Sequence, residues 1–283
     1  MTTAPTVERP RALAEISGTI VLVGAGKMGA AMLEAWLALG LDAKSVVVLE
    51  PKPSREIGAL VARGLRLNPS ITTAAEAAAI VIAVKPQVAP QVVPGLAPYV
   101  GARTVTLSIM AGRTLAFLEG ALAQRAALVR AMPNTPAAIG RGITVAVPNV
   151  RVSQRQREIA HALLAATGAV EWIKDEALMD AVTAVSGSGP AYVFLLTEVL
   201  ARSGAAVGLP ADLAERLARA TVAGSGELLN LSATDPATLR QNVTSPGGTT
   251  AAALDVLGGP EGLEALMRRA VAAATRRSRE LAG

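Results

Sequence analysis

One segment near the start of the chain limits the possible folds more than any other, because an apolar stretch runs into a glycine-rich loop and then a helical pattern. Residues 19–23 are apolar, residues 24–29 read Gly-Ala-Gly-Lys-Met-Gly, and the helical pattern of residues 30–39 stops at Gly40. A glycine directly after a helix commonly provides its left-handed C-terminal cap. This succession predicts a strand, a tight turn and a helix, the repeating unit of a parallel α/β sheet.

Further apolar runs predict a sheet of several strands. They lack the alternation of half-exposed strands, and they cover residues 45–50, 80–84, 104–108 and 127–131. Continuous apolar runs are typical of strands covered on both faces. Segments 142–147 and 168–172 are expected to extend the edge of the sheet. The predicted architecture is a Rossmann-like, mostly parallel sheet with crossover helices.

The glycine-rich loop fits the pattern G-x-G-x-x-G of dinucleotide-binding proteins. It lies between a predicted strand and a predicted helix, and Glu50 lies 21 positions beyond Gly29, at the end of the second strand. In this pattern the first glycine makes the turn, the second lets a pyrophosphate approach, and the third lets helix and strand pack. The alternative is a purely structural turn. The expected cofactor contacts are Val23, Gly24, Ala25, Gly26, Lys27, Met28, Gly29 and Glu50.

The residues after the second strand leave the choice between NADPH and NADH open. The Glu50 carboxylate would hydrogen-bond the ribose diol of NADH and repel a 2′-phosphate. Lys52, Ser54 and Arg55 follow directly and could hold that phosphate. For the lysine, a solvated turn between two prolines is the alternative.

Three more loops follow predicted strands, where ligands of doubly wound sheets bind. Ala83-Val84-Lys85-Pro86 follows one strand and Ala111-Gly112 follows the next. Lys85 could neutralise a pyrophosphate or be a solvated loop charge. Asn134, in the segment Met-Pro-Asn-Thr-Pro, could face the nicotinamide or close an Asx turn.

The C-terminal part of the chain loses the strand signals after about Lys174. Helical patterns follow at residues 191–201, 211–231, 250–257 and 262–281. The first of these is apolar on nearly every side, and such a helix has to be buried. We therefore expect a helical domain that dimerises. The predicted domains are a mobile extension at 1–17, a dinucleotide-binding domain at 18–174 and a helical substrate and dimerisation domain at 175–283.

The segment Val243–Thr250 reads Val-Thr-Ser-Pro-Gly-Gly-Thr-Thr and directly precedes an apolar helical run. Two glycines after a proline allow a tight turn, and the amide groups at the start of the next helix favour an anion. Ser245 and the two threonines add hydroxyls beside it. These features predict a pocket for a carboxylate with a neighbouring hydrogen-bonding atom. The alternative is an ordinary helix N-cap provided by a threonine.

Composition argues against several classes of function. A net charge of +5 with only six aromatic residues gives no basic patch with stacking rings, so nucleic-acid binding is not expected. The chain has no cysteine and one histidine, His161, which is expected on the surface and cannot assemble a metal site. Mean hydropathy is +0.42, but charges, prolines and glycines interrupt the long apolar stretches, so no membrane span is expected. Residues 1–16 lack the apolar core of a signal peptide, and we expect a cytoplasmic protein.

Taken together, five motifs of the chain resemble those of pyrroline-5-carboxylate reductases. They are Gly24–Gly29, Ala83–Pro86, Ala131-Met-Pro-Asn-Thr-Pro136, Ser186-Gly-Ser-Gly-Pro-Ala-Tyr192 and Val243–Thr250. The similarity extends from about Thr19 to Leu281. It implies an enzyme that reduces a cyclic imine to proline with NADPH or NADH. It also implies dimers formed through the helical domain, which in this family are often assembled further into decamers.

The resemblance also implies roles for individual residues. Gly248, Thr249 and Thr250 would hold the carboxylate and ring nitrogen of the substrate, with Thr250 and Ser245 as the catalytic residues. Glu176 falls where the family has a substrate-contacting acid. The dinucleotide would lie along Val23–Met28, Ala83–Pro86, Ala111–Gly112 and Asn242.

The scarcity of acid–base groups favours reduction of an imine over reduction of a ketone. A nascent alkoxide needs a proton donor, and no lysine follows Lys174. A cyclic imine can bind already protonated, so that orientation and exclusion of water suffice. Two alternatives stay open: a β-hydroxyacid dehydrogenase, which would use a lysine in the helix at 191–201 where this chain has none, and a dinucleotide-sensing protein without catalysis.

Overall fold

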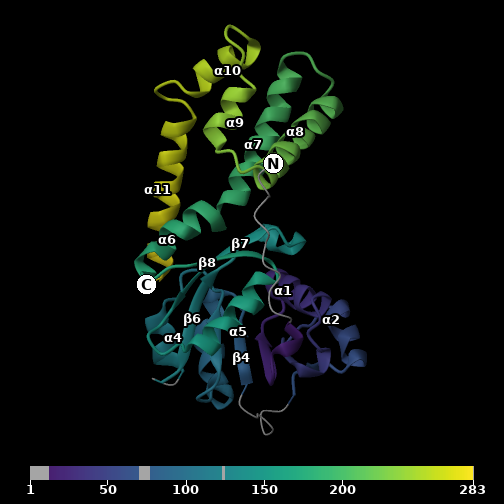
Figure 1. Ribbon diagram of the computed structural model, residues 1–283, viewed down its shortest axis with the longest axis vertical. Helices are drawn as coiled ribbons and strands as arrows, with labels where there is room; N and C mark the ends of the chain where they lie inside the picture. Colours follow the sequence, from purple (N-terminus) through teal and green to yellow (C-terminus); the bar gives the residue numbers. More distant parts are fainter. Residues whose placement is uncertain (1–12, 70–76, 123–124, 283) are drawn as a thin grey trace. The chain divides into compact units, whose positions relative to one another are not determined.

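The computed structural model describes residues 13–69, 77–122 and 125–282 (Figure 1). The chain forms two compact units. Ser188–Ala274 make up a helical unit, and the sheet unit contains the described residues up to Gly187 together with the end of the chain from Thr275. This division lies later than the boundary at 174/175 expected from the sequence, because Met179 still packs against Val145 and Val147 of the sheet unit.

Eight strands form one sheet in the spatial order β3-β2-β1-β4-β5-β6-β7-β8, which confirms the predicted fold class. All neighbouring strands are parallel except β6 and β7. From β1 the chain proceeds to β2 and β3 on one side and crosses to β4 on the other, so the order reverses between β1 and β4. The strands are β1 Thr19–Val23, β2 Val46–Leu49, β3 Arg66–Leu67, β4 Ala77–Ile82, β5 Val105–Ser108, β6 Ala127–Met132, β7 Gly142–Pro148 and β8 Gly168–Trp172.

Helices cover both faces of the sheet. The division follows the alternation of side chains along β1, since Ile20 and Leu22 join one core cluster while Val21 and Val23 join the other. On the first face lie α1 (Lys27–Ala38), α2 (Arg55–Ala59) and α5 (Gln154–Ala165). On the second face lie α3 (Ala89–Val92) and α4 (Leu115–Ala121).

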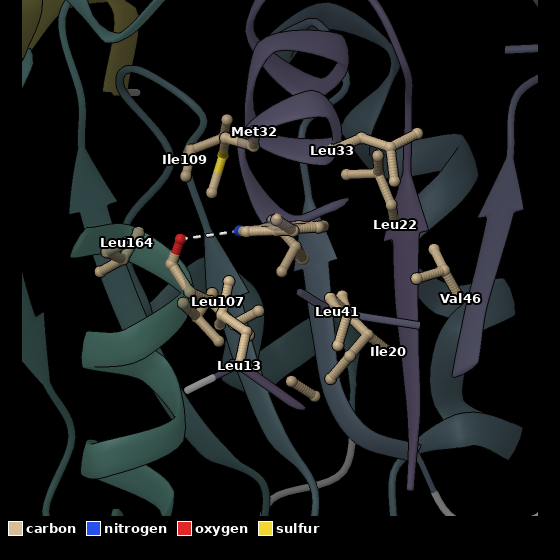
Figure 2. Close-up of a cluster of buried hydrophobic side chains, with 14 of the residues drawn as sticks. Leu13, Ile20, Leu22, Met32, Leu33, Leu41, Val46, Leu107, Ile109 and Leu164 are labelled. Carbon is tan, nitrogen blue, oxygen red and sulfur yellow. Dashed lines mark hydrogen bonds between the residues drawn. The ribbon is translucent and has the colours of Figure 1, made fainter. Parts of the chain in front are cut away.

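Figure 2 shows the larger of these clusters, to which α1 contributes Met32 and Leu33. The Trp36 side chain of the same helix is fully buried, and its Nε1 donates a hydrogen bond of 2.8 Å to the carbonyl oxygen of Leu163 in α5. A buried indole N–H requires such an acceptor. The contact fixes α1, whose N-terminus follows the glycine loop, against α5.

The start of the chain corrects one expectation. Residues 1–17 were predicted to form a mobile extension, of which residues 1–12 lie outside the described part. Leu13–Glu15 form a 3₁₀ helix, and the Leu13 side chain is fully buried in the cluster of Figure 2. The prediction is therefore wrong for Leu13–Glu15, because the leucine contributes apolar area to the core.

Many large apolar side chains of the helical unit are exposed in the single chain. Its helices are α7 (Gly189–Ala206), α8 (Ala211–Leu231), α9 (Pro236–Asn242), α10 (Thr249–Leu257) and the first part of α11 (Leu263–Ala282). A Cβ at Gly204 would lie 3.3 Å from the Ala214 side chain, so α7 and α8 approach closely. The large exposed apolar side chains of α7 are Val193, Phe194, Leu195, Leu196, Val199 and Leu200. An apolar surface of this extent marks an interaction face.

One stretch differs from the expectation that the chain has no membrane-length segment. Within the described residues, Glu176–Ala206, which includes α6 (Met179–Val182) and α7, is long and apolar enough to cross a membrane, and 6% of its most apolar window is buried. Length and composition do not separate a membrane span from a helix that packs against another protein chain.

Candidate cofactor and substrate sites

The glycine loop has the geometry of a phosphate-binding turn. Gly24 has φ +88°, and a Cβ there would lie 2.9 Å from the carbonyl group of Ala83. A Cβ at Gly29 would overlap the carbonyl oxygen of Gly24, so α1 can pack on β1 only with glycine at this position. By contrast, a Cβ at Gly26 would have no atom within 4 Å. The geometry agrees with the turn expected at Gly24 and the helix–strand packing expected at Gly29, and it leaves open space over Gly26.

The start of α1 fits a pyrophosphate. Gly26 is the N-cap, and no side chain caps the helix there. The first N–H groups of a helix have no partner within the helix and attract anions. The open space over Gly26 lies at this same end of the helix, where a bulkier residue would fill it. The loop therefore has both the donors and the room that a dinucleotide phosphate requires.

Four strand ends meet beside this loop. The N–H of Gly24 donates to the Leu49 carbonyl oxygen at 2.8 Å, and the N–H of Ala83 donates to that of Val23 at 2.7 Å. The N–H of Ile109 continues the ladder to the carbonyl oxygen of Ile82 at 3.0 Å. The carboxyl ends of β1, β2, β4 and β5 therefore lie side by side at the position where the strand order reverses. Val84 lies against the loop as well, since one of its methyl groups is 2.9 Å from the Cβ position of Gly24.

Arg113 is a residue that the sequence analysis missed. Its Nε and Nη2 atoms donate to the Pro86 carbonyl oxygen at 3.0 and 2.8 Å, and its guanidinium lies 4.8 Å from the centre of the Phe117 ring. It fixes the loop that carries the exposed Lys85 to the loop after β5. The position of the arginine, directly after Ala111-Gly112, was the available signal.

Gly112 and Asn134 have structural partners. Gly112 has φ +72°, and a Cβ there would lie 3.3 Å from the carbonyl oxygen of Leu281, near the end of α11. The Asn134 side-chain oxygen accepts the N–H of Ile143 at 3.0 Å, which braces the start of β7. This partner lies nine residues on, so the bond is not an Asx turn.

Glu176 forms an ion pair at the border of the sheet unit. Its Oε1 atom accepts hydrogen bonds of 2.8 Å from Nη1 of Arg130 and of 2.8 Å from the N–H of Leu115. The Arg130 side chain is 5% exposed and that of Glu176 is 28% exposed. The Glu176 carboxylate therefore balances the charge of the buried Arg130 guanidinium. Only its second oxygen, Oε2, would be available for a contact with substrate.

The segment Ser186-Gly-Ser-Gly-Pro begins in an unusual turn. Thr183–Gly187 form a π-helical turn, and such turns recur at functional sites. Within the described chain, the hydroxyl of Ser186 is buried without a hydrogen-bond partner. A Cβ at Gly187 would overlap the terminal methyl group of Met132, so the turn packs directly on the end of β6.

In the helical unit, α10 begins with uncapped amide groups. Its N-cap is Gly248, from which no side chain can cap the helix, and the preceding Gly247 has φ +67°. The N–H of Gly248 donates to the Ser245 carbonyl oxygen at 3.0 Å and closes the turn. Thr249 and Thr250 are already helical residues, so the alternative of a threonine N-cap is wrong. Their N–H groups and hydroxyls stand at the positive end of the helix dipole.

The short helix before this loop is held at both ends. The Asp235 carboxylate accepts the N–H groups of Ala237 and Thr238 at 3.0 Å, and hydrogen bonds from Thr238 lower the pKa of Asp235. At the other end, the Thr244 hydroxyl donates to the Arg240 carbonyl oxygen at 2.6 Å. Asn242 is the exposed last residue of α9. The loop therefore begins from a fixed helix end.

His161 lies at the surface of the sheet unit. His161 is exposed on α5 and accepts a hydrogen bond of 3.2 Å from Nε1 of Trp172, in agreement with the expected surface position. In the part of the chain that the structure describes, no three His, Cys, Asp or Glu side chains gather closely enough to hold a metal ion.

Comparison with known proteins identifies both parts of the chain. The family described as pyrroline-5-carboxylate reductase dimerisation matches residues 176–281. The family described as NADP oxidoreductase coenzyme F420-dependent matches residues 19–112. The first match covers the helical unit together with residues 176–187 and 275–281 of the sheet unit, and the second covers the glycine-loop half of the sheet unit.

Individual relatives match over nearly the whole chain. A pyrroline-5-carboxylate reductase of Pseudomonas aeruginosa is 40% identical over 266 residues, which is 93% of this chain and 96% of that protein. The solved structure of a pyrroline-5-carboxylate reductase from Coxiella burnetii is 31% identical, with a TM-score of 0.87, and covers 95% of this chain and 100% of that one. The Plasmodium falciparum pyrroline carboxylate reductase, solved with NADP bound, is 28% identical, with a TM-score of 0.80, over 94% of this chain and 99% of that one. This chain belongs to the pyrroline-5-carboxylate reductase family.

Proposed function

We propose that the chain reduces pyrroline-5-carboxylate to L-proline by hydride transfer from NADPH or NADH. The observation that carries this proposal is the start of α10, where uncapped amide groups and two threonine hydroxyls stand together behind a Gly-Gly turn. An anionic carboxylate with a nitrogen close to it suits this arrangement. A dinucleotide sensor without catalysis would have no use for it.

The glycine loop would hold the dinucleotide. The N–H groups at the start of α1 would bind the pyrophosphate over Gly26, and Glu50 would face the adenosine ribose. Lys85, Asn134 and Asn242 are proposed cofactor contacts, together with Val23, Ala83, Val84, Pro86, Ala111 and Gly112. When bound, the reduced nicotinamide supplies the hydride.

The substrate would bind at the Val243–Thr250 loop. The N–H groups of Thr249 and Thr250 would hold its carboxylate, while the Thr250 hydroxyl would bond the ring nitrogen. Gly248 gives the ring access because it has no side chain, and Ser245 closes the turn through its carbonyl oxygen. Glu176 is proposed to reach the substrate through the oxygen that Arg130 does not occupy.

Reduction of a cyclic imine depends more on orientation of the substrate than on acid catalysis. A protonated cyclic imine already carries the proton that its nitrogen needs, so the residues must hold one face of the ring toward the nicotinamide and exclude water. The loop between α9 and α10 offers amide and hydroxyl groups and no Lys, His, Asp or Glu side chain. A β-hydroxyacid dehydrogenase would require a proton donor in its place.

Turnover assays separate the three candidate functions. In one set of reactions, purified protein is mixed with pyrroline-5-carboxylate and either NADPH or NADH. In a second set, it is mixed with a panel of β-hydroxyacids and the oxidised dinucleotide. Oxidation of the dinucleotide with the cyclic imine alone supports the proposal. Turnover only with hydroxyacids, or binding without any turnover, would replace it by the dehydrogenase or the sensor.

Replacing Thr250 by alanine is expected to lower kcat with the imine about 10- to 100-fold, the cost of losing one hydrogen bond to a charged group. The dissociation constant of the cofactor should change less than about twofold, because Thr250 belongs to the substrate loop. Steady-state kinetics and dinucleotide titration measure both quantities. Thr221→Ala, at an exposed position of α8, is the matched control. Unchanged kcat in Thr250→Ala would remove Thr250 from the site.

We propose that the helical units of two chains dimerise through α7, and that dimers assemble further into a decamer. Phe194 is 66% exposed in the single chain. Phe194→Arg should weaken the dimer at least about 100-fold, because an interface charge would be buried without a partner. Sedimentation over a concentration series measures the shift, with Arg216→Ala on exposed α8 as the control. A monomeric wild-type protein at micromolar concentration would contradict the proposal.

The same proposal accounts for the membrane-length stretch Glu176–Ala206. A second copy of the chain would cover its apolar side chains, and the protein would then work in the cytoplasm without binding a membrane or nucleic acid. Fractionation of cells that produce the protein, followed by detection in the supernatant and membrane fractions, tests the location.

A further inference from the structure

The Glu50 carboxylate has a fixed position beside the glycine loop. Its Oε2 atom accepts the N–H of Ala25 at 2.9 Å, and its Oε1 atom accepts the N–H of Lys52 at 3.0 Å. The first bond joins the end of β2 to the middle of the glycine loop, 25 residues earlier in the chain. The carboxylate is half-buried. Both of its oxygens are thus anchored by backbone amides.

The backbone of Glu50 is fixed as well. Its N–H donates to the side-chain oxygen of Asn68 at 2.8 Å, and its carbonyl oxygen accepts the side-chain NH₂ of Asn68 at 2.9 Å. Asn68 has φ +45°, and asparagine is one of the few residues that adopt this left-handed conformation readily. Two bonds to the main chain and two to the side chain therefore hold Glu50 in place.

The anchored Glu50 carboxylate favours an adenosine ribose with free hydroxyls over one that carries a 2′-phosphate. Each carboxylate oxygen has a second lone pair, so Glu50 can accept the two hydroxyls of an unmodified ribose without losing its own bonds. A 2′-phosphate carries a charge of about −1.5 to −2 at pH 7 and would meet the carboxylate directly. Rotation of the side chain away from that phosphate would break the bonds to Ala25 and Lys52. The loop amide would then lack a partner, at a cost in free energy.

The neighbouring turn does not offset the repulsion. The Ser54 hydroxyl accepts the N–H of Ile57 at 3.3 Å as the N-cap of α2, and its hydrogen bond to Glu56 lowers the pKa of that carboxyl group. The two basic side chains of the turn, Lys52 and Arg55, are exposed, and the carboxylates of Glu50 and Glu56 lie in the same stretch of chain. The charges balance, whereas recognition of a 2′-phosphate calls for an excess of basic groups.

We propose that Glu50, anchored by Ala25 and Lys52, makes this chain selective for NADH over NADPH. The inference rests on the proposed function, because it takes the glycine loop as the site of a nicotinamide dinucleotide. It names the subsite that discriminates: the ribose hydroxyls at the end of β2. One matching family is described as an NADP oxidoreductase, and one relative was solved with NADP bound. A preference for NADP in those proteins does not extend to this chain, because selectivity depends on the residues of this turn.

Equilibrium binding tests the preference without turnover. Dissociation constants of NADH and NADPH are measured by calorimetric titration for the wild type, for Glu50→Gln and for Glu34→Gln, which removes an equal charge from an exposed position of α1. The wild type and Glu34→Gln should bind NADH at least about tenfold more tightly than NADPH. Glu50→Gln keeps an acceptor for the Ala25 N–H and should narrow the ratio to about threefold or less. High salt should also narrow the wild-type ratio, because it screens the repulsion.

Three other results of the binding measurements would contradict the inference. Equal or tighter binding of NADPH by the wild type overturns the inference and leaves the proposed reductase function intact. A ratio that Glu50→Gln leaves unchanged also overturns it, since the discrimination would then come from another residue. Failure of the wild type to bind either dinucleotide overturns the inference and the proposed function together.

Discussion

Replacing Gly26 by alanine is expected to lower the affinity for NADH at least about tenfold, while costing about 1 kcal/mol or less of folding stability. In the free protein a methyl group at this position meets no atom within 4 Å. It would, however, occupy the space through which a pyrophosphate approaches the start of α1. Calorimetric titration measures the affinity, and unfolding in urea measures the stability.

Gly29→Ala is the matched comparison and should behave differently. Its methyl group would overlap the Gly24 carbonyl oxygen and lie 3.3 Å from the Ala83 side chain. Helix α1 would have to move away from β1, with an expected cost of about 1–3 kcal/mol in the free energy of unfolding. Affinity for the dinucleotide should fall as well, because the loop geometry changes.

The difference between the two variants is the informative result. A Gly26→Ala protein that binds the dinucleotide as tightly as the wild type would show that the pyrophosphate lies elsewhere. A Gly29→Ala protein of unchanged stability would show that α1 has room to accept a methyl group beside β1.

Glu176→Ala is expected to lower the free energy of unfolding by about 2–4 kcal/mol, because it leaves Arg130 buried without its counter-ion. The Arg130 side chain is only 5% exposed, and loss of one partner of a buried pair costs more than the pair contributes in total. The 28% exposure of Glu176 lets water reach part of the site, which places the value below that of a fully buried pair.

A double variant that removes both charges separates this structural role from a contact with substrate. Arg130→Met combined with Glu176→Leu should recover most of the stability lost in Glu176→Ala, since no unpaired charge remains. If Glu176 also contacts the imine, the double variant should still show a raised KM for the imine at normal dinucleotide affinity. Equal stability of the wild type and Glu176→Ala would contradict the ion-pair account.

The sheet could be predicted from the sequence because its strands are continuous apolar runs. The bounds of β1 and β8 agree with the prediction, and so do those of α8. The two-residue strand β3 was missed because two residues carry no periodicity. Helix α9 was missed although Asp235-Pro236, an N-cap followed by proline at the first helical position, was a usable signal.

The candidate site could be predicted only where it is local in sequence. The glycine loop is a continuous motif, and Glu50 was found by its fixed distance from it. The ion pair of Arg130 with Glu176 spans 46 residues, and the bond from Arg113 to Pro86 spans 27. Such pairs depend on which strands are neighbours and in which register, and the sequence alone does not specify this.

The threonine N-cap, given as the alternative for the Val243–Thr250 segment, does not form. Threonine is preferred over most residues at an N-cap, yet Gly248 takes that position and leaves the hydroxyls of Thr249 and Thr250 uncommitted to capping. The preference for a residue type at an N-cap is a local tendency, and here the Pro-Gly-Gly turn places a glycine at that position instead.

Transfer of deuterium tests the central claim most directly. The purified protein is incubated with pyrroline-5-carboxylate and NADH in which both hydrogens on C4 of the nicotinamide are deuterium, and the proline formed is analysed by mass spectrometry and NMR. The account predicts L-proline with one deuterium at carbon 5 and none elsewhere. Proline without deuterium, or dinucleotide oxidation without formation of proline, would contradict it.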